Sequence, residues 1–196
     1  MIKADKIPSN RVCQGDVVRN VDYVEAIVEH DGVLELTKIR FPLIIVLTQD
    51  CDLEQDYSIR SEGPPTQDRK LISVLVAPLY NADHVFAGEH LSDLQIASEL
   101  ISKNKTPGDY LVKNQRPRYH YLDFPPEIDI VPSVIDFKHY FSVNVTYLEA
   151  LKATDFVCTV SQLYREDVSQ RFAAFLSRIG LPSLVQASNH SLNTDA

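Results

Sequence analysis

The sequence predicts an α+β fold that is rich in β-structure, either a small barrel or a strongly curved antiparallel sheet with two packed helices. Short runs of β-branched residues recur along the chain, and turn-forming residues separate them. Asp31-Gly32 stands between two such runs, which is a strong signal for a tight hairpin. Residues 90–104 and 161–179 carry apolar side chains at helical spacing. Many short strands with two helices are typical of this class.

Most of the predicted strands lie in the first half of the chain. Pro42 is expected at the start of its strand, where no ladder donor is lost, and Pro78 at the end of another. Residues 54–70 are polar and contain Gly63-Pro64-Pro65, so we expect a long exposed loop there. The predicted strands are residues 17–24, 26–28, 33–39, 41–47, 71–77, 119–122, 128–135 and 141–145.

Each predicted helix has its own start and stop signals. Ser92 is expected to cap the helix at 90–104, and Ser161 the helix at 161–179. Gly180 and Pro182 form the expected stop of the second helix. That helix carries one apolar stripe, which we interpret as a face packed on the core. The stripe consists of Tyr164, Val168, Phe172, Phe175, Leu176 and Ile179.

Length and charge limit the classes of protein that fit. The chain has 196 residues, which suits a single globular domain over residues 1–186 with a flexible tail at 187–196. The formal net charge is −8, which disfavours general binding to nucleic acid or to an anionic membrane, although a local basic patch remains compatible with either.

The cysteines and the apolar runs indicate a cytoplasmic protein with reduced thiols. Cys13, Cys51 and Cys158 are far apart and form no CxxC pair, which excludes a zinc ribbon or a thioredoxin motif. No run approaches the roughly 18 apolar residues of a membrane span, and the N-terminus does not read as a signal peptide. We therefore expect no membrane association, and no cofactor other than Mg²⁺ under the enzyme hypothesis described below.

A carboxylate pair follows the most apolar predicted strand, residues 41–47. Along a continued strand, Asp50 and Asp52 would share one face and Cys51 would face the core. Two carboxylates on one face could bind Mg²⁺. Asp also favours turns, where its carboxylate accepts bonds from loop amides, and this second interpretation is the one we favour.

Cys51 and the histidines offer a second route to catalysis. A nucleophilic thiol needs a nearby base, and His120 and His139 are the candidates from distant strands. The neighbouring acids would raise the thiol pKa, which opposes this chemistry. His84 and His90 lack the spacing of a helical metal site, so we expect most histidines to be surface or hydrogen-bonding residues.

Residues 103–121 form the one basic and aromatic segment. Basic side chains contact phosphates and aromatic rings stack on bases, so this segment could bind single-stranded nucleic acid. The alternative that we favour is a solvated loop around Pro107-Gly108. The candidate contact residues are Lys113, Arg116, Arg118 and Tyr119, together with Lys103, Lys105, Tyr110, His120 and Tyr121.

Gly15-Asp16-Val17-Val18, the hairpin after it and the run from Arg40 to Leu47 resemble the PemK/MazF-like toxins over residues 15–78. The resemblance implies an SH3-like barrel, a dimer and a bacterial toxin–antitoxin or phage-defence context. It also implies cleavage of single-stranded RNA, with Arg40 as the counterpart of the family's catalytic arginine, displaced by one position through Phe41. The family's catalytic Thr or Ser has no counterpart, because Ala77-Pro78 stands in its place.

Two functional hypotheses follow. The leading one is a binding module of this barrel type, with a protein or nucleic-acid partner. The alternative is a metal-assisted phosphodiesterase or endoribonuclease. It would use Asp50 and Asp52 with His120, and these groups would have to converge within about 5 Å.

Overall fold

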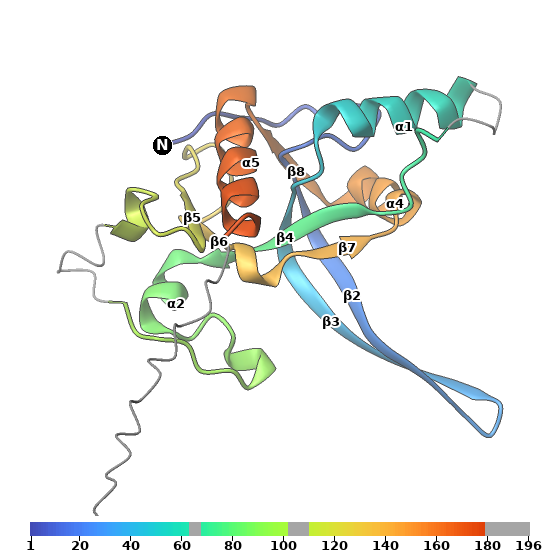
Figure 1. Cartoon of the computed structure of the whole chain (residues 1–196), viewed down its shortest axis with the longest axis horizontal. Helices are drawn as coiled ribbons and strands as arrows, with labels where there is room; N and C mark the ends of the chain where they lie inside the picture. The colour runs from blue at the N-terminus through green and yellow to red at the C-terminus, as the bar shows by residue number, and fades with distance from the viewer. Residues whose placement is uncertain (63–67, 102–109, 179–196) are drawn as a thin grey trace, which may run out of the picture.

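The computed structural model describes residues 1–62, 68–101 and 110–178, and it has the predicted α+β class (Figure 1). Eight antiparallel strands form an open, curved sheet in the order β1-β8-β2-β3-β4-β6-β5, with β7 also paired to β4. The strands are β1 (Ala4–Asp5), β2 (Asp16–His30), β3 (Val33–Val46), β4 (Val74–Asn81), β5 (Tyr119–Leu122), β6 (Ser133–Asp136), β7 (Phe141–Val143) and β8 (Phe156–Val160). The helices are α1 (Asp50–Glu62), α2 (Ala82–Ala87), η1 (Ser92–Leu94), η2 (Phe137–His139), α4 (Val145–Asp155) and α5 (Gln162–Leu176).

The hairpin between β2 and β3 confirms the prediction made from Asp31-Gly32. His30 pairs with Val33, so Asp31 and Gly32 alone form the turn. Asp31 has φ 51° and Gly32 has φ 76°. Positive φ at both central positions is the type I′ turn, whose twist matches that of the flanking strands.

Pro42 lies inside β3, not at the start of a strand as predicted. Arg19 pairs with Leu43 and Val21 with Phe41, while Asn20 and Pro42 form no pair. Asn20 has φ 58°, a left-handed conformation that Asn adopts more readily than most residues. The ladder is thus interrupted where Pro42 has no N–H to donate.

Pro78 likewise lies within its strand, which continues to Asn81. Val76 and Pro78 pair with β3, and from Leu79 onward β4 pairs with β6. Pro78 is the last residue of β4 that pairs with β3, and Leu79 is the first that pairs with β6. The predicted strand 71–77 was therefore placed too early, and the predicted end at Pro78 was wrong.

Both faces of the central strands are covered. Ile45 packs in one apolar cluster, whereas its neighbours Ile44 and Val46 pack in a second cluster on the opposite face. The first cluster includes Phe172 of α5, and the second includes Leu148 of α4. Coverage on both faces explains why residues 41–47 are almost continuously apolar.

α5 confirms the helix predicted at 161–179, as far as the described residues extend. Its apolar stripe packs on the first cluster through Val168 and Phe172. Ser161 stands at the N-cap, but its side chain makes no capping hydrogen bond. Leu176 is largely exposed. The expected stop at Gly180, Pro182 and the predicted tail lie outside the described residues.

The helix predicted at 90–104 is wrong over its described part. Only η1 is helical, and Gln95, which follows it directly, has φ 58°. Ile96 and Leu100, which the helical pattern counted as core, are exposed. The stretch from Ile96 to Ile101 is neither helix nor strand, and residues 102–104 lie outside the described ranges.

A buried ion pair joins α4 to the start of β2. Lys152 Nζ lies 2.7 Å from Asp16 Oδ2, and both side chains are almost fully buried. The same carboxylate accepts bonds from the Cys13 amide and from the Thr159 hydroxyl. Lys152 Nζ also donates to the Ser9 hydroxyl. The pair thereby ties the N-terminal loop, β2, α4 and β8 together.

We predict that Lys152→Met lowers the free energy of unfolding by ~3–5 kcal/mol, because it leaves the Asp16 carboxylate buried without a counter-charge. Urea denaturation measures the change. The control is Lys38→Met, which breaks the more exposed Lys38–Asp22 pair and should cost at most ~1 kcal/mol. Adding Asp16→Asn to Lys152→Met should recover part of the loss. A Lys152→Met protein as stable as the control would contradict this prediction.

Candidate functional site

Asp50, Cys51 and Asp52 begin a helix, which corrects three predictions. The strand ends at Val46, and α1 occupies most of the segment predicted as a loop. Residues two apart on a helix point in different directions, so the two carboxylates do not share one face. Cys51 is exposed, contrary to its predicted position in the core. Two Asp residues in the first turn favour a helix start, and this signal was available in the sequence.

The Asp50 carboxylate is already occupied by neighbouring groups. Arg11 donates to both of its oxygens at 3.1 Å, and the Gln14 amide donates to Oδ1 at 3.1 Å. Arg165 of α5 donates to Oδ2 at 3.3 Å. Burial raises the pKa of Asp50, but these partners outweigh it and hold the pKa below its usual range. Asp50 thus cross-links the N-terminal loop, α1 and α5. Its partners are two arginines and the Gln14 backbone amide, not amides of the loop predicted to follow it.

His120 lies apart from this cross-link. Its side chain is buried on β5, and its nearest acidic partner is Asp167, 3.9 Å from Nε2. Among the described residues, Asp50, Asp52 and His120 do not belong to any group of three ligand atoms within 4.8 Å of one another. The geometry that the enzyme hypothesis requires is therefore not assembled.

Arg40 lies on the surface near the outer part of the hairpin. Its Nε donates to Asp22 Oδ1 at 2.7 Å, and Lys38 donates to Oδ2 of the same carboxylate. Hydrogen bonds from Arg40 and then Lys38 lower the pKa of Asp22 to about 2. The charge of Arg40 is therefore paired across the hairpin.

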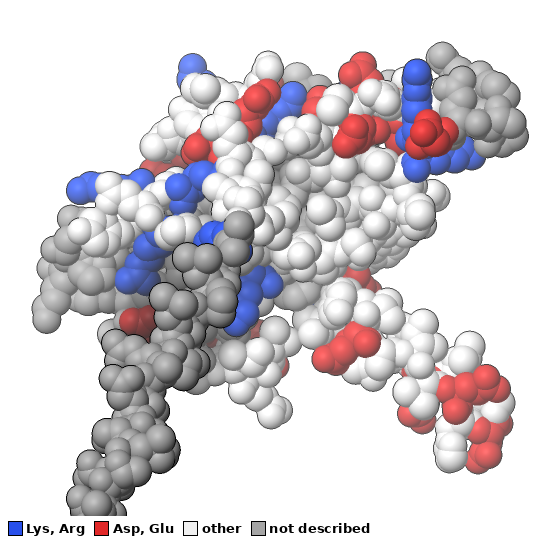
Figure 2. Space-filling view, in the orientation of Figure 1, with Lys and Arg blue, Asp and Glu red and all other residues white. Residues whose placement is uncertain are grey.

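Part of the predicted basic segment lines a cavity of about 640 Å³. Figure 2 shows Lys and Arg side chains gathered around the lower end of α5, over the side of the sheet that carries β6. Among the described residues that line it, Glu99 is the only carboxylate. The basic residues that line the cavity are Arg116, Arg118, Lys138, His139 and Arg178.

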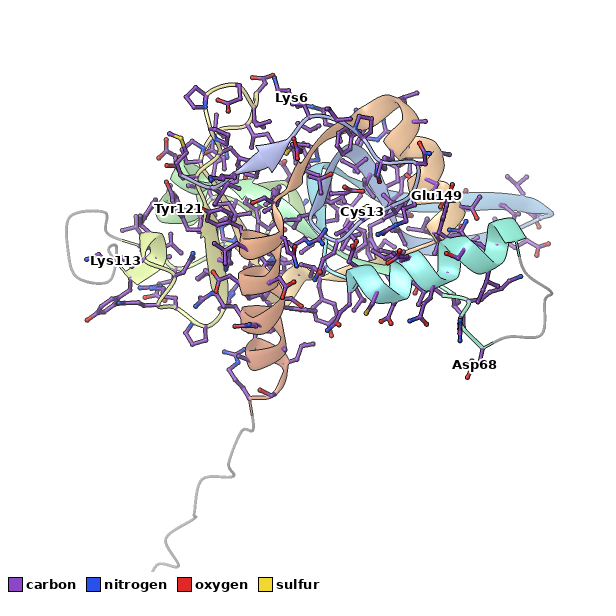
Figure 3. All side chains as sticks on the ribbon, turned by 90° about the horizontal axis from the view of Figure 1, so that it is seen from above. Lys6, Cys13, Asp68, Lys113, Tyr121 and Glu149 are labelled. Carbon is purple, nitrogen blue, oxygen red and sulfur yellow. The ribbon has the colours of Figure 1, made fainter. Side chains whose placement is uncertain are left out.

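The predicted contact residues divide into three groups. Arg116 and Arg118 line the cavity, and Tyr119 is buried beside it with the Arg118 guanidinium 5.0 Å from its ring centroid. Lys113 is exposed on the same side of the molecule as Tyr121, but it does not line the cavity (Figure 3). Lys103 and Lys105 lie outside the described residues.

A cluster of His90, Asp136 and His139 adjoins the cavity. His90 Nε2 lies 3.5 Å and His139 Nδ1 lies 3.3 Å from the same oxygen, Asp136 Oδ2. Arg118 Nε donates to the other oxygen, Oδ1, at 2.8 Å. Burial raises the pKa of Asp136, but the His90 and Arg118 side chains outweigh it and bring the pKa to about 2. The carboxylate is therefore ionised at neutral pH.

Sequence reasoning missed this cluster because its members come from separate segments. His90 precedes η1, Asp136 ends β6 and His139 ends η2. No spacing along the chain connects His90 to the other two. Asp136 and His139 are three residues apart, which gives only a weak local signal.

The outer part of the β2–β3 hairpin, residues 24–38, projects away from the body of the molecule (Figure 1). We call it the arm. Ile27 pairs with Leu36, and Glu29 pairs with Leu34, so these side chains share one face. Ile27 is 63%, Leu34 70% and Leu36 53% exposed. Sequence analysis predicted the hairpin, but it did not show that the paired strands extend beyond the core.

Family models, curated proteins and solved structures all give no match to this chain. Within the described ranges, no helix is long and apolar enough to cross a membrane.

We predict that His120 makes the protein less stable in mild acid. Burial, followed by the charge of Arg171, lowers its pKa to about 3. Below its ordinary pKa of about 6.5, the unfolded chain takes up a proton that the folded chain refuses. The resulting loss of stability between about pH 7 and about pH 5 is ~2 kcal/mol.

Urea denaturation of His120→Leu at both pH values tests this prediction. The variant should lack the ~2 kcal/mol contribution, while the exposed control His30→Leu should follow the wild type. If His120→Leu and the wild type lost equal stability between pH 7 and pH 5, the pKa of His120 would not be lowered by folding, and the prediction would be wrong.

Proposed function

We propose that the chain is a binding module that docks onto a protein partner through its arm, in the bacterial toxin–antitoxin or defence context that the PemK/MazF-like resemblance implies. The observation that carries the proposal is the aliphatic face of Ile27, Leu34 and Leu36 on a projecting hairpin. An isolated two-stranded hairpin is only marginally stable in water, and exposed strand edges invite pairing. A partner that covers this face buries its aliphatic side chains and so stabilises the hairpin.

The charge of the arm indicates what kind of partner fits. Figure 2 shows acidic side chains on the projecting hairpin. Its acidic residues are Glu25, Glu29, Asp31 and Glu35. Symmetric pairing of two arms would bring these like charges together, which disfavours an arm-to-arm homodimer. We therefore expect a partner whose apolar groove or sheet edge has a basic rim.

The arrangement of the predicted catalytic residues also favours a binding role over the alternative phosphodiesterase or endoribonuclease. Asp50 is held by Arg11 and Arg165, and Arg40 is paired with Asp22. Neither side chain has the free charge that a substrate phosphate or a metal would need. The aliphatic face of the arm, by contrast, has no covering segment within the described residues.

Binding to the product of the adjacent gene, measured by isothermal titration calorimetry, tests the proposal. We predict that Ile27→Thr/Leu36→Thr weakens binding at least about tenfold, because each buried aliphatic side chain contributes ~1.5–3 kcal/mol. Thr keeps the β-propensity of the arm. Thr37→Ser, on the opposite face of the same hairpin, is the control and should bind as the wild type does.

Added salt should weaken wild-type binding, since the rim contacts are between charges. If the wild type does not bind this product, the toxin–antitoxin context fails. If the double variant binds as tightly as the wild type, the arm is not the docking surface.

The basic cavity supports a second candidate function, the binding of a single-stranded nucleic acid. Arg116 and Lys138 line it, and no described carboxylate lies within ion-pair range of either side chain. Such unpaired cations are available to phosphate oxygens in a way that Arg118, which is bound to Asp136, is not. The volume of the cavity suits one or two nucleotides rather than a duplex.

We predict that Arg116→Ala and Lys138→Ala each weaken binding of a fluorescent single-stranded RNA. Each should reduce the slope of log K against log salt concentration by about 1. Fluorescence anisotropy at several salt concentrations measures both effects. The control is Arg69→Ala, since Figure 3 places the adjacent Asp68 on the opposite side of the molecule from Lys113. Equal losses in all three variants would indicate non-specific attraction and exclude the cavity as the site.

A further inference from the structure

Three segments bring two imidazoles to one carboxylate oxygen. His90 and His139 approach Asp136 Oδ2 to 3.5 and 3.3 Å, and the ligand atoms of all three residues lie within 4.8 Å of one another. Donor atoms bound tetrahedrally to one Zn²⁺ at about 2.0–2.1 Å are separated by about 3.3 Å. The two distances to Oδ2 therefore match those between ligands of a single ion.

His90 is the observation that points to a ligand. Its side chain is 1% exposed, and neither ring nitrogen has a hydrogen-bond partner within the described part of the chain. A buried polar group without a partner is costly and uncommon. Tyr80 packs edge-to-face on the His90 ring at 4.9 Å between centroids, which holds the ring in place. Nε2 faces Asp136 Oδ2 at 3.5 Å without a hydrogen bond of normal geometry, and a metal ion bound by both atoms would satisfy this nitrogen.

The groups around the cluster suit a ligand role for its other two members. Arg118 Nε and the Lys138 amide donate to Asp136 Oδ1, and outer hydrogen bonds of this kind orient a ligating carboxylate. Arg118 Nη2 also reaches Oδ2.

The donor set selects the class of ion. Two imidazole nitrogens with one carboxylate favour Zn²⁺ and neighbouring transition metals, whereas Mg²⁺ and Ca²⁺ favour oxygen-rich sites. The Arg118 charge offsets that of Asp136, which further disfavours ions held mainly by charge. His139 is 21% exposed and lines the basic cavity, so a fourth coordination position would open toward that cavity.

We propose that His90, Asp136 and His139 bind one divalent transition-metal ion of the Zn²⁺ class, with an open coordination position facing the basic cavity. The site is independent of the arm and of the residues for which metal binding was predicted, Asp50 and Asp52.

Zinc and cobalt binding to the full chain, freed of any affinity tag and treated with EDTA, tests the proposal. Calorimetry should show one Zn²⁺ per chain, and Co²⁺ should give the visible absorption of a site with nitrogen and oxygen ligands. His139→Ala should weaken Zn²⁺ binding by more than about tenfold. The matched control is His84→Ala, which removes an exposed histidine from the nearby helix α2.

Two further variants keep the test decisive. If His139→Ala fails to fold by circular dichroism, His139→Gln replaces it, because Gln keeps a polar side chain of similar size. Cys51→Ser removes the exposed thiol, the other common zinc ligand. Absence of Zn²⁺ binding in the wild type would overturn the proposal. So would binding that survives loss of His139 or disappears in Cys51→Ser.

Discussion

The fold depends most on the buried pair between Asp16 and Lys152. Asp16 is the first residue of β2, and its carboxylate receives groups from the N-terminal loop, from α4 and from β8. Removing either charge leaves the other buried away from solvent without a counter-charge. The pair therefore fixes where the long hairpin begins, and so it fixes which residues of β2 and β3 fall inside the core and which extend beyond it.

The hairpin therefore has a buried inner part, which belongs to the core, and an exposed outer part, the arm. Val17 and Val18 are fully buried, whereas Ile27 and Val28 on the same strand are more than half exposed. The fold does not need the outer residues, because the two clusters that cover the central strands are complete without them. Aliphatic side chains on a solvent-exposed hairpin add little to the stability of the free monomer beyond their cross-strand contacts, and burial against a partner is the role that we propose for them.

The elements that the sequence predicted correctly are those whose signals lie within a few neighbouring residues. Asp31-Gly32 and the stripe of α5 are complete within a few residues, so both were predictable. Residues 90–104 carry an equally helical pattern, yet tertiary contacts overrode it: the Ser98 amide donates to Gly88 and the Ile101 amide to Phe86. Asp50 stands out in the sequence because it follows an apolar strand, but its partners Arg11 and Arg165 are distant in the chain. The His90–Asp136–His139 cluster was missed for the same reason, since only the fold brings it together.

The metal site and the basic cavity, both still proposals, would act on each other through His139, which belongs to both. A bound divalent ion would add positive charge to the wall of a cavity that already presents Arg116 and Lys138. A phosphate group in that cavity would in turn stabilise the ion, because coupling between two binding sites is reciprocal. Arg118 holds the Asp136 carboxylate in place and balances its charge. The net charge that such a phosphate meets would then depend on whether the ion is bound, so metal occupancy could control anion binding without any movement of the sheet.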